Sequence, residues 1–462
     1  GAQSVAIIGG ARGTNEDAYA WSLFAQALGV TNVDAQLDDG LPASVFGYNQ
    51  ATIDQAANAT TVILLSPDLK EELPILYLRL RDASEKKRSK LIEFAPKQTG
   101  ITRYAWKSVA YEPGNQVAVV ASTLADATIA AQVAKGSVVV VVGRANLAED
   151  DSFTMAALDA VMAAAPNATV LPVIRRGNVR GAIESGLVTG STTSILRSAV
   201  AGKINCLILL GADPIADVRD TELARQAMAA VQHVIAIDTF ASSSSQRADV
   251  LLPAAAFGEK DGTTTNLEGR VTQLNRKVNV HGTARPDWMI ALELADYLGH
   301  DLGVGSVQEV HQQLVSKVAA FGDATRAALA INPDGVLLRR SSGNVSAGSA
   351  PTVPDRPGFG YRLVVSRKLY DNGSNVAHSA SLAPLAPGSS LHMHPLDLDR
   401  LGAAVGAQVK VSSDRTSIVM PIVADESVTR GTVWAAWAQN GSNIGELIDS
   451  SRSVNDVKVE TL

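Results

Sequence analysis

Polar residues follow several predicted strands at positions where a nucleotide could bind. Gly211 and Asp213 lie in a turn directly after the apolar run 207–210, and Asp238 follows the next predicted strand, 234–237. In dinucleotide-binding folds, a strand-ending acid one strand–helix–strand unit after a glycine turn holds a ribose hydroxyl. Strand-ending aspartates also cap helices and turns. The pattern therefore leaves both a ribose-binding role and a structural role open.

A second stretch with candidate binding residues is 248–278, which combines two predicted strands with a polar, turn-rich segment. The apolar strand 250–252 ends at Pro253, and a turn-rich excursion follows before a second strand, 271–274. Glycine in such a turn is free to adopt a positive φ. Ligands of open α/β sheets bind outside the carboxyl ends of the strands. One hypothesis is therefore a non-catalytic cofactor pocket formed by Gly211, Asp213, Asp238, Gly262 and Asn266.

Metal ligands and nucleophiles are sparse. Cys206 is the single cysteine, which excludes disulfides within the chain and a four-cysteine iron–sulfur cluster. Asp38 and Asp39 precede a glycine, a pattern typical of a solvated turn. His392 and His394 alternate along a predicted strand, but no third ligand completes a metal set. The order of residues reveals no Ser–His–Asp, Cys–His, Walker A or zincin arrangement, so we predict no catalytic residue and no metal site.

The elements that position these residues predict an α/β protein with a separate β domain. Apolar strands alternating with helical segments indicate a first α/β lobe formed by 1–38 and 136–310, with a second α/β lobe, 39–135, inserted in it. Residues 311–350 are expected to form a helix and a linker rich in Gly, Ser and Pro. Short, regularly spaced strands in 351–462 predict a small barrel.

Composition narrows the class of partner. The chain has 462 residues, of which 46% are hydrophobic and 19% charged, and its formal net charge is −6. This acidic balance argues against nucleic-acid binding, which leaves a basic footprint. No apolar run reaches the roughly 20 residues of a membrane helix, so we expect no direct membrane insertion. The first residues lack the charged and apolar regions of a signal peptide, and the first of them is not Met. We therefore expect this sequence to be a segment of a longer protein.

Several of these motifs together resemble a known family. The run 248–253 (ADVLLP), the segment Asn266–Arg270, the segment Arg285–Trp288 and the C-terminal His394–Asp397 look like the molybdopterin oxidoreductase superfamily. They are most similar to its cofactor-poor branch, the family of large G subunits of bacterial NADH-quinone oxidoreductase (respiratory complex I). The resemblance runs from Gly9 to the end of the chain. It implies two doubly wound Rossmann-like lobes followed by a C-terminal double-psi β-barrel.

The sequence departs from the family pattern at two places. In active members a cysteine, selenocysteine or other metal ligand follows the segment that here reads Asn32–Asp34, but no thiolate is present. Ala95-Pro96-Lys97 stands where relatives carry Asp-Pro-Arg, and alanine cannot hold a ribose hydroxyl. In the family, positions such as Asp238 flank the pterin guanosine. The resemblance and its departures thus imply a vestigial pocket without a cofactor in this segment.

The resemblance implies a part of an enzyme complex that is not itself catalytic. The expected role is a cluster-free scaffold that supports electron transfer from NADH to quinone, coupled to proton translocation. [2Fe-2S] and [4Fe-4S] clusters are implied for a region preceding Gly1, partners are the other hydrophilic-arm subunits, and the location is the cytoplasmic side of the bacterial plasma membrane. Two alternatives stay open: an active molybdopterin enzyme of the formate dehydrogenase or nitrate reductase kind, and a non-catalytic pterin- or nucleotide-binding module.

Overall fold

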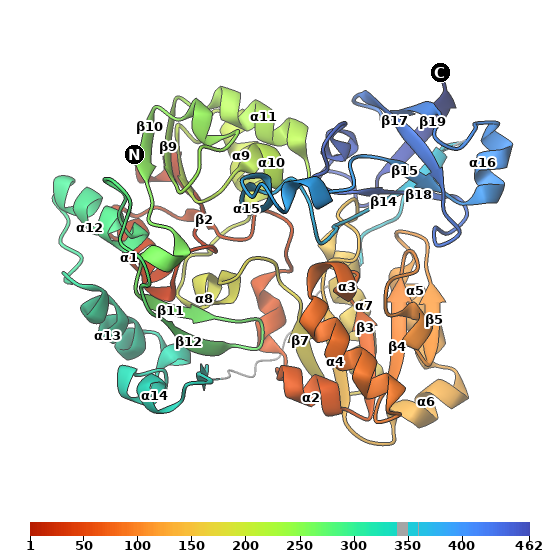
Figure 1. Ribbon diagram of the computed structural model, residues 1–462, viewed down its shortest axis with the longest axis horizontal. Coiled ribbons are helices and arrows are strands. Elements are labelled where there is room, and N and C mark those ends of the chain that lie inside the picture. Colours follow the sequence, from red (N-terminus) through yellow and green to blue (C-terminus); the bar gives the residue numbers. More distant parts are fainter. Residues whose placement is uncertain (340–349, 359) are drawn as a thin grey trace. The chain divides into compact units, whose positions relative to one another are not determined.

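The computed structural model describes residues 1–339, 350–358 and 360–462, and the chain divides into two compact units (Figure 1). Unit 1 comprises Gly1–Gly40 and Ile174–Ser341, and unit 2 comprises Leu41–Val173 and Ser342–Leu462. Each unit is built around a parallel sheet, and unit 2 also contains a barrel. Of the predicted linker, residues 340–349 lie outside the described part of the chain.

Unit 1 is built on a five-stranded parallel sheet with the strand order β10-β9-β8-β1-β2. Its central strands are apolar runs with few exposed residues, as expected for a parallel sheet covered on both faces. The strands are β1 (Val5–Gly9), β2 (Asn32–Asp34), β8 (Cys206–Leu210), β9 (His233–Asp238) and β10 (Val250–Pro253). A small antiparallel sheet follows, with β11 (Gly262–Thr265), β12 (Arg270–Leu274) and β13 (Val336–Leu337).

Capping residues define the ends of the first helix of unit 1. Thr14 caps the first helix by accepting the N–H of Asp17, whose side chain accepts the Thr14 N–H, and Gly29 ends that helix in the left-handed conformation. The helices are α1 (Asn15–Leu28), α8 (Val179–Glu184), α9 (Thr192–Val200), α10 (Pro214–Asp217), α11 (Thr221–Ala230), α12 (Asp287–Tyr297), α13 (Val307–Lys317) and α14 (Arg326–Ile331). Figure 1 shows α12 and α13 beside α1.

Unit 2 contains a second five-stranded parallel sheet with the order β5-β4-β3-β6-β7. Its strands are β3 (Thr61–Leu65), β4 (Lys90–Ala95), β5 (Lys107–Ala110), β6 (Val138–Val142) and β7 (Thr169–Pro172). Its helices are α2 (Ile53–Asn58), α3 (Leu69–Glu72), α4 (Pro74–Glu85), α5 (Gln116–Leu124), α6 (Ala127–Val133) and α7 (Asp151–Ala164).

The boundary between the two lobes differs from the predicted one. We expected 136–310 to belong to the first lobe, but β6 pairs with β3 and β7 pairs with β6 in the second sheet. A run of five valines identifies a strand buried on both faces, yet it carries no information about which sheet the strand joins. That choice depends on a partner strand more than 70 residues earlier in the chain.

The rest of unit 2 forms a closed six-stranded barrel with the order β14-β18-β15-β17-β16-β19. Its interior is a cluster of buried Leu, Ile, Val, Met and Trp side chains, and Leu147 and Ala148 from the loop after β6 join this cluster. The predicted α/β fold with a C-terminal barrel is thus confirmed. The strands are β14 (Gly360–Ser366), β15 (Leu391–Met393), β16 (Gln408–Ser412), β17 (Ser417–Ala424), β18 (Thr432–Ala436) and β19 (Asp456–Thr461), and the helices are α15 (Ser374–Ala377) and α16 (Pro395–Leu401).

In the described part of the chain, no single helix is both long and apolar enough to cross a membrane. Helices α5 and α6 together meet the length and composition criteria, but they are bent at 82° to each other.

Candidate functional site

Three of the five predicted pocket residues lie at the carboxyl edge of the unit 1 sheet. Gly211 follows β8, Asp213 is the N-cap residue before α10, and Asp238 is the last residue of the neighbouring strand β9. Gly211 adopts a φ of +55°, and its carbonyl accepts a 2.7 Å hydrogen bond from the guanidinium of Arg12. The sheet therefore brings together Gly211, Asp213 and Asp238, as the strand pattern predicts.

The carboxylate of Asp213 is engaged within the protein. It accepts hydrogen bonds from the backbone N–H of Ser243 at 3.0 Å and of Ser244 at 3.1 Å, and from the Ser244 hydroxyl at 2.5 Å. It also caps α10 by accepting the N–H of Ala216. Asp213 thus fixes the serine loop, 242–245, to the sheet edge rather than presenting a free carboxylate to a ribose.

Asp238 is less constrained. Its carboxylate accepts the N–H of Thr239 at 2.9 Å, and burial raises its pKa above that of an ordinary aspartate although hydrogen bonds from Phe240 and Thr239 oppose the shift. The side chain is partly exposed. Of the three residues at this edge, Asp238 is the one with a partly exposed carboxylate at the end of a sheet strand.

The other two predicted residues lie elsewhere in unit 1. Gly262 begins β11 and Asn266 forms the turn between β11 and β12, in the small antiparallel sheet. The Asn266 side chain accepts the backbone N–H groups of Glu268 at 3.1 Å and Arg270 at 2.9 Å, so it shapes its own turn. The structure therefore divides the five predicted residues between two sheets, and the turn chemistry of Asn266 explains its place in the motif.

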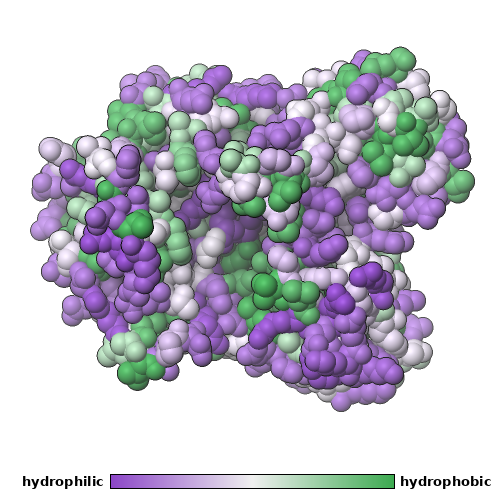
Figure 2. All heavy atoms as spheres, in the orientation of Figure 1, coloured by the Kyte–Doolittle hydropathy of each residue, from purple (hydrophilic) through white to green (hydrophobic). Residues whose placement is uncertain are grey.

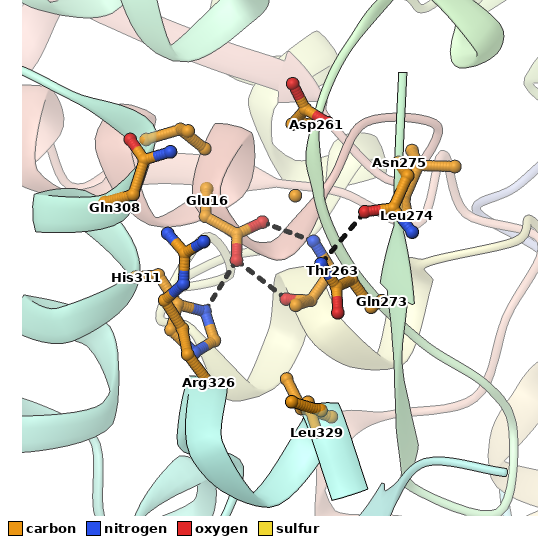
Figure 3. Close-up of a pocket in the computed structure, with 13 residues that line it drawn as sticks. Glu16, Asp261, Thr263, Gln273, Leu274, Asn275, Gln308, His311, Arg326 and Leu329 are labelled. Atoms are coloured by element: carbon orange, nitrogen blue, oxygen red, sulfur yellow. Dashed lines mark hydrogen bonds and ion pairs between the residues drawn. The ribbon is translucent and has the colours of Figure 1, made fainter. Parts of the chain in front are cut away.

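A cavity of about 310 Å³ lies beside this hairpin (Figure 3). Its wall contains a buried carboxylate, Glu16 on α1, which accepts hydrogen bonds from the Thr263 N–H at 2.7 Å and the Thr263 hydroxyl at 2.8 Å. The same carboxylate lies 2.8 Å from Nδ1 of His311 on α13, and the other ring nitrogen lies 3.0 Å from the carbonyl of Ala324. Figure 3 shows Glu16 between Thr263 and His311. The two ring nitrogens of His311 thus face two acceptors, a carboxylate and a carbonyl.

A second buried charge cluster lies at the same end of α1. Lys260 Nζ is 2.8 Å from Asp17 and 2.6 Å from Asp287, and all three side chains are buried or nearly so. Burial alone would lower the pKa of Lys260, but the two carboxylates outweigh it and raise that pKa. Asp17 also accepts the N–H of Trp288, the second residue of α12. These contacts fasten α1 to the hairpin and to α12, so their evident role is structural.

Sequence reasoning did not identify Glu16, His311 or Lys260 as a group. Glu16 appears only as an acid in the first turn of a helix, where acids are common. His311 follows it by 295 residues, and Lys260 follows its partner Asp17 by 243 residues. No local pattern links residues so far apart.

The candidate metal ligands of the sequence have other partners. Asp38 pairs with Arg219 at 2.7 Å, and Asp39 forms a two-pronged ion pair with Arg176 at 2.7 and 3.2 Å. Cys206 begins β8, and burial raises the pKa of its thiol. Over the described ranges, no group of three or more His, Cys, Asp or Glu side chains is arranged to hold a metal ion.

The two candidate histidines also do different things. His394 Nδ1 accepts the N–H of Leu396 and so caps α16. His392 Nδ1 instead lies 2.9 Å from the carboxylate of Asp425. They therefore do not form a metal pair.

The carboxyl edge of the unit 2 sheet carries positive charge in place of the family's acid. Ala95 ends β4, and Lys97 follows it with Nζ 4.7 Å from the ring centroid of Trp434 on β18. Lys368, after β14, lies 5.4 Å from the same ring. Burial lowers the pKa of Lys97. Lys368 pairs with Glu71 at 3.1 Å, and Ala95 provides no acceptor for a ribose hydroxyl.

The fold and these sites define an α/β protein of the molybdopterin type, and sequence profiles agree. The profile of the Molybdopterin oxidoreductase family matches residues 1–297, and that of the Molydopterin dinucleotide binding domain matches residues 361–459. The chain belongs to the molybdopterin oxidoreductase family.

Several curated proteins of this family are similar to the chain in sequence. The chain is 26% identical to NADPH-Fe(3+) oxidoreductase subunit alpha of Geobacter sulfurreducens, over all of this chain and 64% of that protein. It is 27% identical to the G subunit of NADH-quinone oxidoreductase from Mycobacterium tuberculosis, over 95% of this chain and 57% of that protein. It is 24% identical to F420-dependent formate dehydrogenase 1 subunit alpha of Methanococcus maripaludis, over 53% of this chain and 40% of that protein. The chain thus spans less than two thirds of the length of these relatives.

Among solved structures, acetylene hydratase from Pelobacter acetylenicus has the same fold. The TM-score is 0.69 at 12% sequence identity, and the match covers all of this chain and 86% of that one. At this identity the likeness concerns the fold alone.

The family implies a molybdenum-bound pterin, and the residues present do not fit it. The segment after β2 supplies only Asp38 and Asp39, and both carboxylates are neutralised by arginines. At the two sheet edges, Ala95 has no carboxylate and that of Asp213 is bound to the serine loop. Neither the metal nor the nucleotide part finds a complete set of partners among these side chains.

Proposed function

We propose that this chain is the cluster-free scaffold portion of the large peripheral-arm subunit of an NADH:quinone oxidoreductase. In that role it supports electron transfer from NADH to quinone, coupled to proton translocation, without contacting the electron. The NADH-quinone oxidoreductase relative supports this proposal, because it aligns with nearly the whole chain whereas the formate dehydrogenase relative aligns with about half. The Geobacter relative, which aligns with the full chain, is also a subunit of an oxidoreductase by its name.

One observation carries the proposal: the carboxylates nearest the family's metal-ligand position are neutralised within unit 1. Asp39 is almost completely buried against Arg176, and Asp38 pairs with Arg219. A carboxylate already held by a guanidinium must lose that pair before it can bind a metal, and breaking a buried pair costs about 3–5 kcal/mol. The local structure therefore favours a folded scaffold over a metal centre.

Apolar surface is available for neighbouring subunits. Ile75 and Leu78 on α4 are 70% and 51% exposed, and Figure 2 shows hydrophobic atoms gathered over this part of unit 2. Tyr297 and Leu298, at the end of α12 in unit 1, are 87% and 57% exposed. Grouped exposed apolar side chains mark interaction surfaces. We propose that other hydrophilic-arm subunits cover them, that iron–sulfur clusters reside in another region of the subunit, and that the assembly lies on the cytoplasmic side of the bacterial plasma membrane.

The direct test is elemental and pterin analysis of the purified native subunit. Molybdenum, tungsten and iron would be quantified per chain, and released pterin would be measured by fluorescence after oxidation. The scaffold proposal expects molybdenum, tungsten and pterin well below one per chain, with iron that disappears when the chain 1–462 is purified by itself. Near-stoichiometric molybdenum or tungsten together with pterin would overturn it in favour of an active molybdopterin enzyme.

A variant separates the remaining alternative, a pterin- or nucleotide-binding module that the complex requires. Asp238→Ala removes the partly exposed carboxylate at the unit 1 sheet edge. We expect NADH oxidation by the assembled complex to stay near the parental rate, because the proposed scaffold needs no ribose contact there. A large loss of NADH oxidation with normal assembly would contradict the proposal and point to a functional pocket.

A further inference from the structure

Three side chains in the barrel form a hydrogen-bonded Ser–His–Asp chain. Ser390 Oγ lies 3.0 Å from Nε2 of His392, and Nδ1 of His392 lies 2.9 Å from Oδ2 of Asp425. Both distances are ordinary hydrogen bonds. The order serine, Nε2, Nδ1, carboxylate is the one in which a histidine activates a serine nucleophile.

The barrel sets this geometry. Ser390 and His392 are two residues apart, so both lie on one face of the segment that becomes β15, while Leu391 and Met393 point into the core. Strand β17 runs parallel to β15, and Asp425 follows it directly. The backbone N–H of Asp425 donates to the Met393 carbonyl at 2.9 Å, which fixes the carboxylate beside the histidine.

The contacts define the tautomer of His392. A carboxylate accepts hydrogen bonds, so Nδ1 carries the hydrogen and Nε2 presents its lone pair to the Ser390 hydroxyl. The hydrogen bond from His392 is the largest cause that holds the pKa of Asp425 well below its usual range. Asp425 therefore remains a carboxylate at neutral pH and keeps the ring in this tautomer.

The three side chains are accessible to solvent, and a lysine lies near them. The side chains of His392 and Asp425 are each 22% exposed, and Ser390 is partly exposed. Trp434, opposite His392 on β18, packs edge-on against the imidazole with ring centroids 4.6 Å apart. Lys97 Nζ lies 4.7 Å from the centroid of the same indole ring and donates a 3.2 Å hydrogen bond to the carbonyl of Gln98. An ammonium has three donors, so Lys97 can bind an anionic group while it keeps this hydrogen bond.

We propose that Ser390, His392 and Asp425 form a second site with acyl-transfer activity, acting on a small ester or thioester that carries an anionic group. Ser390 Oγ attacks the acyl carbon while His392 Nε2 takes the hydroxyl proton. The carbon–oxygen or carbon–sulfur bond to the leaving group breaks, and His392 returns the proton to that group. Water then attacks the Ser390 ester by the same route, so one ester and one water give one acid and one alcohol or thiol. Lys97 binds the anionic group of the substrate.

The test is covalent labelling of the full chain with a fluorophosphonate, which reacts with activated serines, followed by peptide mass spectrometry. The proposal expects the adduct on Ser390 and slow hydrolysis of an activated aryl ester. Ser390→Ala should abolish both. Asp425→Asn, which favours the wrong tautomer, should lower the labelling rate by roughly 10²–10⁴-fold. Lys97→Met should raise KM for an ester bearing a carboxylate more than KM for its neutral analogue.

Ser381→Ala is the matched control, because Ser381 is an exposed serine of the same unit whose hydroxyl lies 3.3 Å from that of Ser379. It should label and hydrolyse like the parent. Thermal unfolding of each variant verifies the fold. A parent protein that is folded but unlabelled at Ser390, or labelling that survives Asp425→Asn unchanged, would overturn the proposal and leave the three residues as a structural hydrogen-bond network. Because the scaffold proposal is tested by metal and pterin content and not by serine labelling, an unlabelled Ser390 leaves that proposal untouched.

Discussion

Arg176 and Asp39 form a two-pronged ion pair in which the two side chains are only 5% and 1% exposed. The pair joins the segment after β2 to the loop before α8, 137 residues later. A planar guanidinium matches a carboxylate with two parallel hydrogen bonds, which adds geometric specificity as well as energy. In this chain the acid at the family's ligand segment therefore serves the fold.

Removing one partner of this pair should destabilise unit 1 strongly. Asp39→Ala leaves the Arg176 charge buried without its main partner, and we expect a loss of roughly 3–5 kcal/mol in the free energy of unfolding. Urea denaturation monitored by tryptophan fluorescence measures it. The control is Asp54→Ala, which removes an exposed ion pair with Arg79 and should cost at most about 1 kcal/mol. Equal effects of the two substitutions would show that burial of Arg176 and Asp39 does not matter.

Gly262 should tolerate no side chain, because Glu16 occupies the space. A Cβ at Gly262 would lie 2.6 Å from Oε2 of Glu16 and 2.8 Å from Cγ2 of Thr14. Gly262→Ala must displace the carboxylate that holds Thr263 and His311, and we expect a loss of about 1–3 kcal/mol in thermal or urea unfolding. Gly258→Ala is the control, since its Cβ would meet nothing closer than 3.7 Å. A Gly262 variant as stable as the Gly258 variant would contradict this packing.

Glu149 should make the stability of unit 2 depend on pH. Burial raises its pKa from 4.5 to about 7, against the opposing hydrogen bond from the Gly114 N–H. The folded state thus holds a proton that the unfolded state has released, and stability falls as pH rises between about 4.5 and 7. At roughly 1.4 kcal/mol per pKa unit, the whole decrease amounts to roughly 3 kcal/mol.

Unfolding free energies of the parent and of Glu149→Gln across this pH range test the assignment. The amide stays neutral and can still accept the Gly114 N–H, so the variant should lose this part of the decrease. Glu85→Gln, on an exposed part of α4, should retain the parental profile. A Glu149→Gln profile that parallels the parent would exclude Glu149 as the titrating group.

Replacing Asp213 by alanine should destabilise unit 1 more than replacing Asp238, although both residues lie at the same edge of one sheet. Asp213→Ala leaves two backbone N–H groups and the Ser244 hydroxyl without their acceptor, and we expect about 1–3 kcal/mol of destabilisation. Asp238→Ala removes contacts within its own turn and should cost less. Hydrogen exchange in the serine loop, 242–245, should rise in the first variant and not in the second. The reverse order would show that Asp238, rather than Asp213, holds the loop.

Local sequence patterns determined the elements of this protein. The Thr14–Asp17 capping box and Gly29 set both ends of α1, and short spaced strands after residue 351 predicted the barrel. These features could be predicted because capping, turn chemistry and periodicity act between residues a few positions apart. The grouping of Gly211, Asp213 and Asp238 followed as well, since successive parallel strands place their ends at one edge.

The tertiary structure alone decided which elements pair and what the polar residues contact. The valines of β6 suit a strand in either parallel sheet, and their pairing with β3 places them in the sheet of unit 2. Asp38 and Asp39 look like a solvated turn in sequence, but their arginines come from 181 and 137 residues away. Asp425 meets His392 only because β17 pairs with β15. Hydrophobicity and turn residues are local properties, whereas charge pairing and site geometry depend on strand register across the whole fold.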